Sequence, residues 1–483
     1  MTVTTKDYWP NPRRFAGCAC AALLAAVSGC QSYEPRALDV DATRRAFTER
    51  DPGSESVRAF AHRLAQGEHG PQAPSGFDPT DGLTLAEAEP VALVFNRELR
   101  LARLELGVAA AAAEHASRWT DPVLGVDVER IVSGVPHPWV VLGSVGLTLP
   151  VSGRLAAEQA RANAEHAAEL GRVAAKEWAT RSTLRELWIE WSAQAERSRI
   201  AASLIGRLGE FATLAARHEE AGILSRMDER LFRVELASAE AAAAEAKGRV
   251  RELELQLRDV MGLAPTAPVR LVESVAFSPR ITDAAALQAA IESDNPELNA
   301  VRRAYAAAEE SLRAEVRSQY PDLEIGPGYG TDEGDERVLL GVRLPLPLWN
   351  ANRGGIARAQ AQRDAARARF EGTYERLLSQ QAVALNRLNA ARELREAVEG
   401  RLLPLADEQE TDARRVVELG RVDPLMLLNA LRSQQETKGL LLNARAAESI
   451  GAVRLDELLG PPTPRTAEGA GPDGRPRLEG DRQ

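Results

Sequence analysis

Two stretches of the chain repeat apolar side chains at the spacing of very long helices. Residues 154–219 contain no proline, and their apolar residues recur largely every three or four positions. Residues 354–419 repeat the pattern, and a continuous helix of this length would be about 100 Å long. Such spacing is typical of coiled-coil seams. The apolar positions are Leu184, Leu187, Trp191, Ile200, Leu204, Leu208 and Phe211, then Leu377, Ala384, Leu388, Ala391, Val398, Leu402 and Leu405.

Each long helical stretch is followed by a shorter one, at residues 225–261 and 424–459. We therefore expect helical hairpins over residues 154–261 and 354–459. The short arm leaves half of each long helix for another partner, and the helices that end near Arg118 and Gln319 are the candidates. Pro404 and its counterpart Gly206 both weaken a helix interior, which predicts a bend at matched places.

A different period marks two strand pairs, over residues 122–150 and 321–348. Val338, Leu340, Val342 and Leu344 alternate with other residues, a period of two that predicts a strand. Two short hairpins cannot bury themselves. Aromatic residues cluster at their ends, as at a membrane interface, although they could also plug the ends of a soluble sheet. These aromatic residues are Trp119, Trp139, Tyr320, Tyr329 and Trp349.

The chain is duplicated. Asn96 recurs as Asn295, 199 residues later, and Gly222 recurs as Gly420, 198 residues later. Landmarks in the same order indicate a tandem repeat. We place the first repeat at residues 83–262, a linker at 263–282 and the second repeat at 283–460.

The starts of the repeats carry helix-capping residues. Thr84 and Glu87 have the spacing of a capping box. Asn96 and Asn295 are candidate N-caps, and Pro296 suits the first helical position. A leader at 30–82 contains a short helical pattern at 57–64, and a tail at 461–483 is expected to be disordered.

The N-terminus predicts export. Arg13 and Arg14 precede a short apolar run that ends in small residues before Cys30, which indicates a signal peptide over residues 1–29. Small residues before a cysteine resemble a bacterial lipobox, so Cys30 is the candidate lipidation site; an ordinary signal with an incidental cysteine is the alternative. Only Cys30 would remain in the mature chain, which excludes a disulfide within it.

The formal net charge of −10 and the absence of a basic stripe argue against nucleic acid as a partner. The six histidines are scattered, without the spacing of a zinc site. We therefore expect no enzyme activity, no metal site and no cofactor.

The two tight turns between helices are candidate interaction sites, because apolar residues at a turn apex have no folding role. A well-made helix turn with no further function is the alternative. These residues are Gly222, Ile223, Leu224 and Ser225 in the first turn and Gly420, Arg421, Val422 and Asp423 in the second.

The order and duplication of these motifs resemble those of the outer-membrane efflux protein family, the TolC-like channels. Within this family the chain resembles the lipoprotein branch, and its repeat starts and proline-led strands resemble those of the heavy-metal efflux members. The resemblance covers residues 84 to 460. It rests on the Asn-Pro-Glu-Leu helix start at residue 295, the proline-led strands, the segment 344–355 and the glycine-containing turns.

The resemblance implies a mainly α fold with a small membrane β-barrel. Three protomers would each give four strands to a twelve-stranded barrel and long helical hairpins to a trimeric twelve-helix tube. The protein would be a passive duct, anchored in the outer membrane of a Gram-negative bacterium and extending into the periplasm. Its partners would be a periplasmic adaptor protein, which docks at the hairpin turns, and an inner-membrane pump of the resistance-nodulation-division type.

The resemblance also places a gate just past the turns, at Asp228, Met426 and Asn429. Asp228 could instead be a solvated helix-start residue, and core packing is the simpler explanation of Met426. A lipid-anchored periplasmic coiled-coil scaffold without a barrel is the alternative function. The sequence does not specify the exported substrate.

Overall fold

The computed structural model describes residues 33–65, 77–132, 134, 138–332, 334–418 and 424–461. The predicted signal peptide, Cys30, the second turn at 420–423 and the tail beyond residue 461 lie outside the described residues. The chain divides into two compact units at Glu49. In the first unit the described part contains one helix, α2 (Val40–Thr48), whose N-cap is Asp39.

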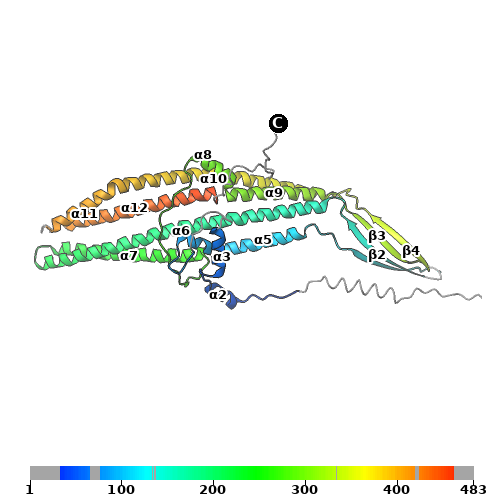
Figure 1. The fold of residues 1–483 in the computed structure, drawn as a ribbon, viewed down its shortest axis with the longest axis horizontal. Helices are drawn as coiled ribbons and strands as arrows, with labels where there is room; N and C mark the ends of the chain where they lie inside the picture. The colour runs from blue at the N-terminus through cyan, green and yellow to red at the C-terminus, as the bar shows by residue number, and fades with distance from the viewer. Residues whose placement is uncertain are drawn as a thin grey trace, which may run out of the picture. The chain divides into compact units, whose positions relative to one another are not determined.

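The second unit consists mainly of helices (Figure 1). The longest helices are α6 and α10, as the apolar spacing predicts. In order, the helices are α3 (Glu55–Ala65), α4 (Leu85–Phe95), α5 (Arg97–His115), α6 (Arg154–Glu220), α7 (Arg226–Val260), α8 (Ala284–Asp294), α9 (Pro296–Arg317), α10 (Arg353–Ala397), α11 (Leu403–Glu418) and α12 (Pro424–Leu459).

Helix starts follow the predicted capping chemistry. The Thr84 hydroxyl and the Glu87 carboxylate form the capping box of α4. Asn96 caps α5, Asn295 caps α9, and Pro296 is the first residue of α9. These side chains accept hydrogen bonds from backbone N–H groups that the first helical turn leaves without partners.

Helix α6 packs along α7 and α5 and also along α9 and α12, while α10 packs against α9 and α12 (Figure 1). The predicted division of partners is therefore confirmed: each long helix pairs with its return arm over one part and with a preceding helix over the other. Apolar clusters fill these seams; one contains Trp188, Leu253 and Leu257, and another contains Leu377, Leu388 and Leu455.

The expected interruption of the second long helix is found close to Pro404. A π-helical segment, η1 (Val398–Leu402), separates α10 from α11. This widened turn accommodates the missing proline N–H. At Gly206 helix α6 continues without interruption from Arg154 to Glu220, so the bend expected there stays a prediction. Glycine lowers helix propensity but keeps its N–H, so packing retains the helix there.

The four strands form one antiparallel sheet in the order β1-β2-β3-β4. They are β1 (Val123–Arg130), β2 (Trp139–Leu149), β3 (Leu323–Asp332) and β4 (Asp335–Arg343). Strands β2 and β3 pair across the two repeats. Figure 1 shows the sheet at one end of α6, α9 and α10, with the α6–α7 turn at the opposite end. Leu344, which the alternation placed in a strand, lies just beyond β4.

Candidate functional site

The register of the sheet separates apolar from polar side chains. Paired residues share a face of a sheet, and the pairs Val128↔Val141, Leu147↔Ile325 and Tyr329↔Val338 connect one face across all four strands. This face, which we call the apolar face, carries Leu124, Val126, Val128, Val141, Val145, Leu147, Leu149, Leu323, Ile325, Tyr329, Val338, Leu340 and Val342.

The opposite face of the sheet is more polar. Asp127, Glu129, Ser144 and Thr148 lie on it, and the Arg343 guanidinium pairs with the Glu324 carboxylate at 3.0 Å. Thus two repeats with different sequences place most of their polar strand residues on the same side of one sheet, with Arg130, Thr331 and Glu336 as exceptions.

Nothing in the described chain covers the apolar face: Leu124 is 75% exposed, Val338 84% and Leu340 71%. The outer edges of β1 and β4 also pair with no strand among the described residues. A sheet with a bare apolar face and two open edges requires a further covering, by lipid or protein.

Four of the five predicted aromatic residues lie at the ends of the strands. Trp119, Tyr320 and Trp349 are close to the helix-side ends of the strands, and Trp139 is at the far end of β2. Tyr329 pairs with Gly143 and Val338 near the middle of the sheet, so the expectation that it lies at a strand end is wrong. All five are exposed, and the Arg130 guanidinium lies over the Trp139 ring. The strand between the two ends spans about 25 Å at 3.3 Å per residue.

The first helical turn combines capping with exposed apolar residues. Gly222 has φ 72°, in the left-handed region that suits the end of a helix. The N–H groups of Ile223 and Leu224 donate to the His218 carbonyl at 2.8 and 3.2 Å. The Asp228 N–H donates to the Ser225 hydroxyl oxygen at 3.2 Å, and the Ser225 N–H donates to the Asp228 carboxylate at 3.4 Å, which makes a capping box. The Ser225 hydroxyl also donates to this carboxylate at 2.7 Å.

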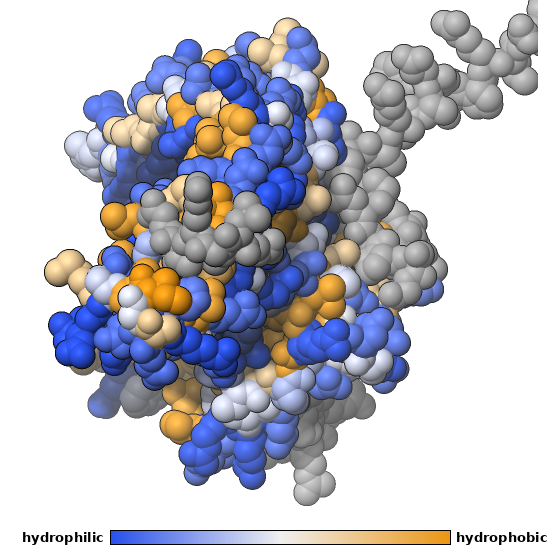
Figure 2. Space-filling view, turned by 90° about the vertical axis from the view of Figure 1, so that its left-hand side faces the viewer, coloured by the Kyte–Doolittle hydropathy of each residue, from blue (hydrophilic) through white to orange (hydrophobic). Residues whose placement is uncertain are grey.

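Of the apolar residues expected at this apex, Ile223 is 65% exposed, whereas Leu224 is half-buried against the cluster beneath the turn. The expectation that Leu224 is bare is therefore wrong. Met227 and Leu425 are exposed at the same end. Figure 2 looks onto this end and shows hydrophobic side chains between charged ones.

The three gate candidates have different surroundings. The Asp228 carboxylate is held in the capping box, in agreement with the helix-start reading. Met426 is half-buried against a cluster that contains Phe232 and Leu431, as core packing predicts. Asn429 is exposed on α12.

Polar contacts, which the sequence did not reveal, connect the two hairpins near this end. The Arg432 guanidinium on α12 binds the Glu235 carboxylate on α7, with Nε to Oε1 at 2.8 Å. This hydrogen bond lowers the pKa of Glu235. The Arg207 Nη1 donates to Gln434 at 2.7 Å, and the Gln434 amide donates to Asp407 at 2.8 Å.

A buried ion network at mid-length was also not visible from the sequence. The Arg185 Nε donates to the Glu89 carboxylate at 2.5 Å, and its Nη1 donates to Asp456 at 2.7 Å. The side chains of all three are at most 7% exposed. Arg181 also binds Glu89, and Arg280 also binds Asp456. The network joins α4, α6, α12 and the linker between the repeats.

Within the described residues no group of three or more His, Cys, Asp and Glu side chains could hold a metal ion. A search of the described helices finds none that is both long enough and apolar enough to cross a membrane.

Comparison with known proteins gives a family match over the second repeat and a fold for most of the chain. Residues 286–461 match the family model "Outer membrane efflux protein". The chain is 28% identical over 268 residues to the cobalt-zinc-cadmium resistance protein CzcC of Cupriavidus metallidurans, a match that covers 55% of this chain and 64% of CzcC, less than two thirds of its length.

Two solved structures have the same fold at low identity. The outer membrane protein VceC of Vibrio cholerae aligns with a TM-score of 0.66 at 17% identity, over 78% of this chain and 96% of VceC. The CmeC outer membrane channel of Campylobacter jejuni aligns with a TM-score of 0.67 at 12% identity, over 89% of this chain and 94% of CmeC. The predicted fold class, long helical hairpins with four strands per chain, is confirmed.

Proposed function

We propose that the chain belongs to the outer membrane efflux protein family, whose model matches residues 286–461, and that it forms the outer-membrane channel of a tripartite efflux system. The apolar face of the sheet carries the proposal. Three copies of the four-stranded sheet would close into a barrel of twelve strands, which removes both open edges and gives the apolar face to lipid. The polar face would then line a water-filled passage.

The helices would continue this passage as a tube into the periplasm of a Gram-negative cell. The protein would provide a path and no chemistry, with energy supplied by an inner-membrane pump, of the resistance-nodulation-division type in our proposal. The family consists of transport proteins, which supports the expected lack of enzyme activity. Trp139 and the helix-side residues Trp119, Tyr320 and Trp349 lie at opposite ends of the strands, as aromatic residues at the two membrane interfaces would.

We place the adaptor at the far end of the helices. Ile223 and Met227 are exposed there without a folding role in the chain, which suits a surface that a periplasmic protein covers. Gly222 and Ser225 shape this turn, and residues 420–423 would form the second turn. Asp228, Met426 and Asn429 remain our candidates for the constriction next to it.

Conductance tests the proposal directly. Purified protein in detergent should run as a heat-modifiable trimer, and in planar bilayers it should give single-channel currents. A water-soluble monomer with no current would contradict the duct and favour a periplasmic scaffold.

Lipidation of Cys30 is a separate part of the proposal. Cys30→Ser should prevent acylation, so that metabolically supplied palmitate no longer labels the protein, while the trimer and its conductance remain. Unchanged palmitate labelling of Cys30→Ser would contradict the assignment of this cysteine.

The contact between the hairpins predicts a change in gating. Arg432→Ala should raise the ratio of open to closed channel about fivefold, because a partly exposed ion pair contributes up to about 1 kcal/mol to the closed state. Single-channel recording measures this ratio. Arg233→Ala is the control, since Arg233 pairs with Glu229 inside α7; an equal effect of both variants would contradict the role of Arg432.

The same contact predicts a pH dependence. Arg432 lowers the pKa of Glu235 in the folded chain. The ion pair therefore stabilises the closed state fully at pH values above the pKa of a glutamate without a partner, which is about 4.3. This stabilisation is lost as the pH falls through the lower folded value. Open probability should therefore rise in acid, and Glu235→Gln should be open more often at neutral pH already.

A further inference from the structure

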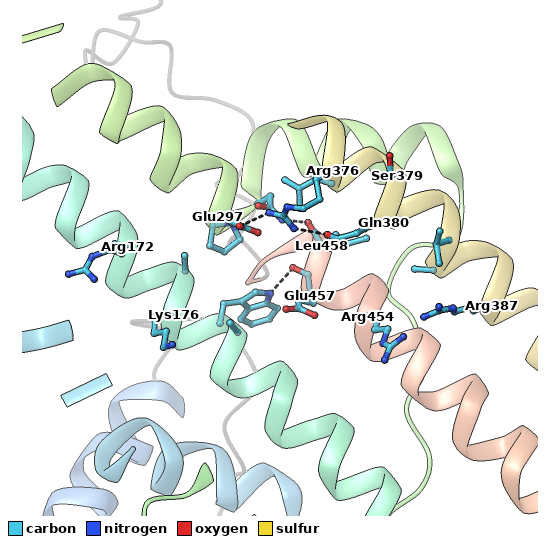
Figure 3. A pocket seen from close by; sticks show the side chains of 18 residues that line it. Arg172, Lys176, Glu297, Arg376, Ser379, Gln380, Arg387, Arg454, Glu457 and Leu458 are labelled. Carbon is cyan, nitrogen blue, oxygen red and sulfur yellow. Dashed lines mark hydrogen bonds and ion pairs between the residues drawn. The ribbon is translucent and has the colours of Figure 1, made fainter. Parts of the chain in front are cut away.

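A cavity lies where the return arm of the second repeat ends and α9 begins. Its volume is about 690 Å³, and its walls come from α6, α9, α10 and α12. Trp178, Leu377 and Val383 supply apolar surface, and Glu457 supplies a carboxylate. Figure 3 shows Glu457 in the centre of this cavity, between α6 and α12.

Part of the cavity wall comes from the side of α10 that faces away from α8. Tyr374 and Gln381 contact α8, because the Tyr374 hydroxyl donates to Glu292 at 2.7 Å and the Gln381 amide donates to the Ala284 carbonyl at 2.7 Å. Arg376 and Val383, which line the cavity, each follow one of these residues by two positions. Two residues turn a helix by about 200°, so Arg376 and Val383 lie on a side of α10 turned away from its contacts with α8.

Comparison of the two repeats shows that the Glu457 carboxylate lacks an ion-pair partner that the matching residue of the first repeat has. Glu457 corresponds to Asp259, 198 residues earlier, as the alignment of Gly262 with Gly460 requires. In the first repeat Arg97, directly after the N-cap, pairs with Asp259 at 2.5 Å. In the second repeat the residue after the N-cap is Pro296, which has no charge.

Among the described residues no side chain hydrogen-bonds to the Glu457 carboxylate or pairs with it. Burial and, to a smaller extent, the neighbouring carboxylates Glu186 and Glu297 raise the pKa of Glu457 to about 7, although Arg454 and Arg376 act in the opposite direction. The chain therefore places no ion-pair partner against this carboxylate, and a cationic ligand would stabilise its ionised form.

Most cations around the cavity are already neutralised. Arg376 pairs with Glu297 at 2.5 Å, Arg454 pairs with Glu186 at 3.0 Å, and Lys176 pairs with Glu98. Arg172 pairs with Glu105 and Glu169. Of the cationic lining residues in the described chain, Arg387 alone has no ion pair, and it is exposed, where a charge binds an anion only weakly.

We propose that this cavity binds amphipathic organic cations, with the positive group of the ligand beside Glu457 and its apolar body against Leu377 and Val383. The place of the cavity in the wall of the duct rests on the proposed function. Because α8 covers the other side of α10 and α12, the cavity would face the passage, where cargo moves past it.

Binding is coupled to a proton. At pH 7 the Glu457 carboxyl is close to half protonated, and a cation favours the ionised form. Ligand binding therefore releases the carboxyl proton to solvent, and affinity should rise by about tenfold between pH 6 and pH 8. A neutral or anionic ligand would show no such rise.

The test is the binding of ethidium, an aromatic organic cation, to the purified full-length trimer, followed by fluorescence. Glu457→Gln should weaken binding at pH 8 by about tenfold and abolish the pH dependence. Asp259→Asn, at the matched position of the first repeat, should bind like the wild type. Unchanged ethidium binding by Glu457→Gln, or tighter binding of the anion fluorescein than of ethidium, would overturn the proposal.

Conductance of the same preparations separates the two proposals. Channels that conduct but do not bind ethidium through Glu457 would refute the cation site and leave the duct intact. Protein that binds ethidium in a Glu457-dependent way but conducts no current would refute the duct and keep the site.

Discussion

Leu340→Arg is expected to prevent most of the protein from inserting into lipid as a folded trimer. Leu340 lies on the apolar face and is 71% exposed in the single chain, so in a barrel its side chain would meet acyl chains. An arginine on the lipid face costs about 2–4 kcal/mol at the middle of the bilayer, and the trimer repeats the cost in each copy. Leu339→Arg, one residue earlier on the polar face, should insert almost normally.

Heat-modifiable migration after refolding into liposomes measures the inserted fraction. The two variants carry the same charge on adjacent residues of β4, so they differ in the face of the sheet and little else. Equal insertion of both would contradict a lipid-facing apolar face, and a stronger defect in Leu339→Arg would mean that the faces are reversed.

Arg185→Met is expected to lower the stability of the protein by about 3–5 kcal/mol, because removing one partner of a buried ion pair leaves charge without compensation. Arg185 lies between Glu89 and Asp456, whose side chains are 7% and 1% exposed. Arg181 and Arg280 can neutralise the Glu89 and Asp456 carboxylates only in part, because neither arginine binds both carboxylates as Arg185 does.

The midpoint of guanidinium unfolding in detergent, followed by circular dichroism, measures this loss. Arg97→Met is the control: its pair with Asp259 also joins two helices but is exposed, so its midpoint should change little. A midpoint of Arg185→Met equal to that of the wild type would show that the network does not hold the repeats together.

Many elements of the fold are local in origin and could be predicted. The capping box of Thr84 and Glu87 depends on residues three apart, and the Asn295-Pro296 helix start depends on adjacent ones. The long helices follow from side chains that recur every three or four residues, a period that selects one face for burial. The duplication then made each element visible twice.

The sites were less predictable. Asp228 has the position of a gate residue in the TolC-like channels that the sequence resembles, but its carboxylate is hydrogen-bonded to Ser225, three residues away. Nothing in the order of residues distinguished a carboxylate that closes a cap from one that faces a passage. The burial of Met426 likewise depends on four helices that pack around it, and the order of residues along the chain does not reveal this packing.

The sequence by itself thus determined the elements, their caps and the repetition, because those depend on neighbours along the chain. Only the tertiary structure decided the common apolar face of four strands, the network around Arg185, which joins residues 96 and 271 positions apart, and the cavity at Glu457. Each of these depends on side chains from both repeats, and their meeting is set by how the long helices and strands pack rather than by any local pattern.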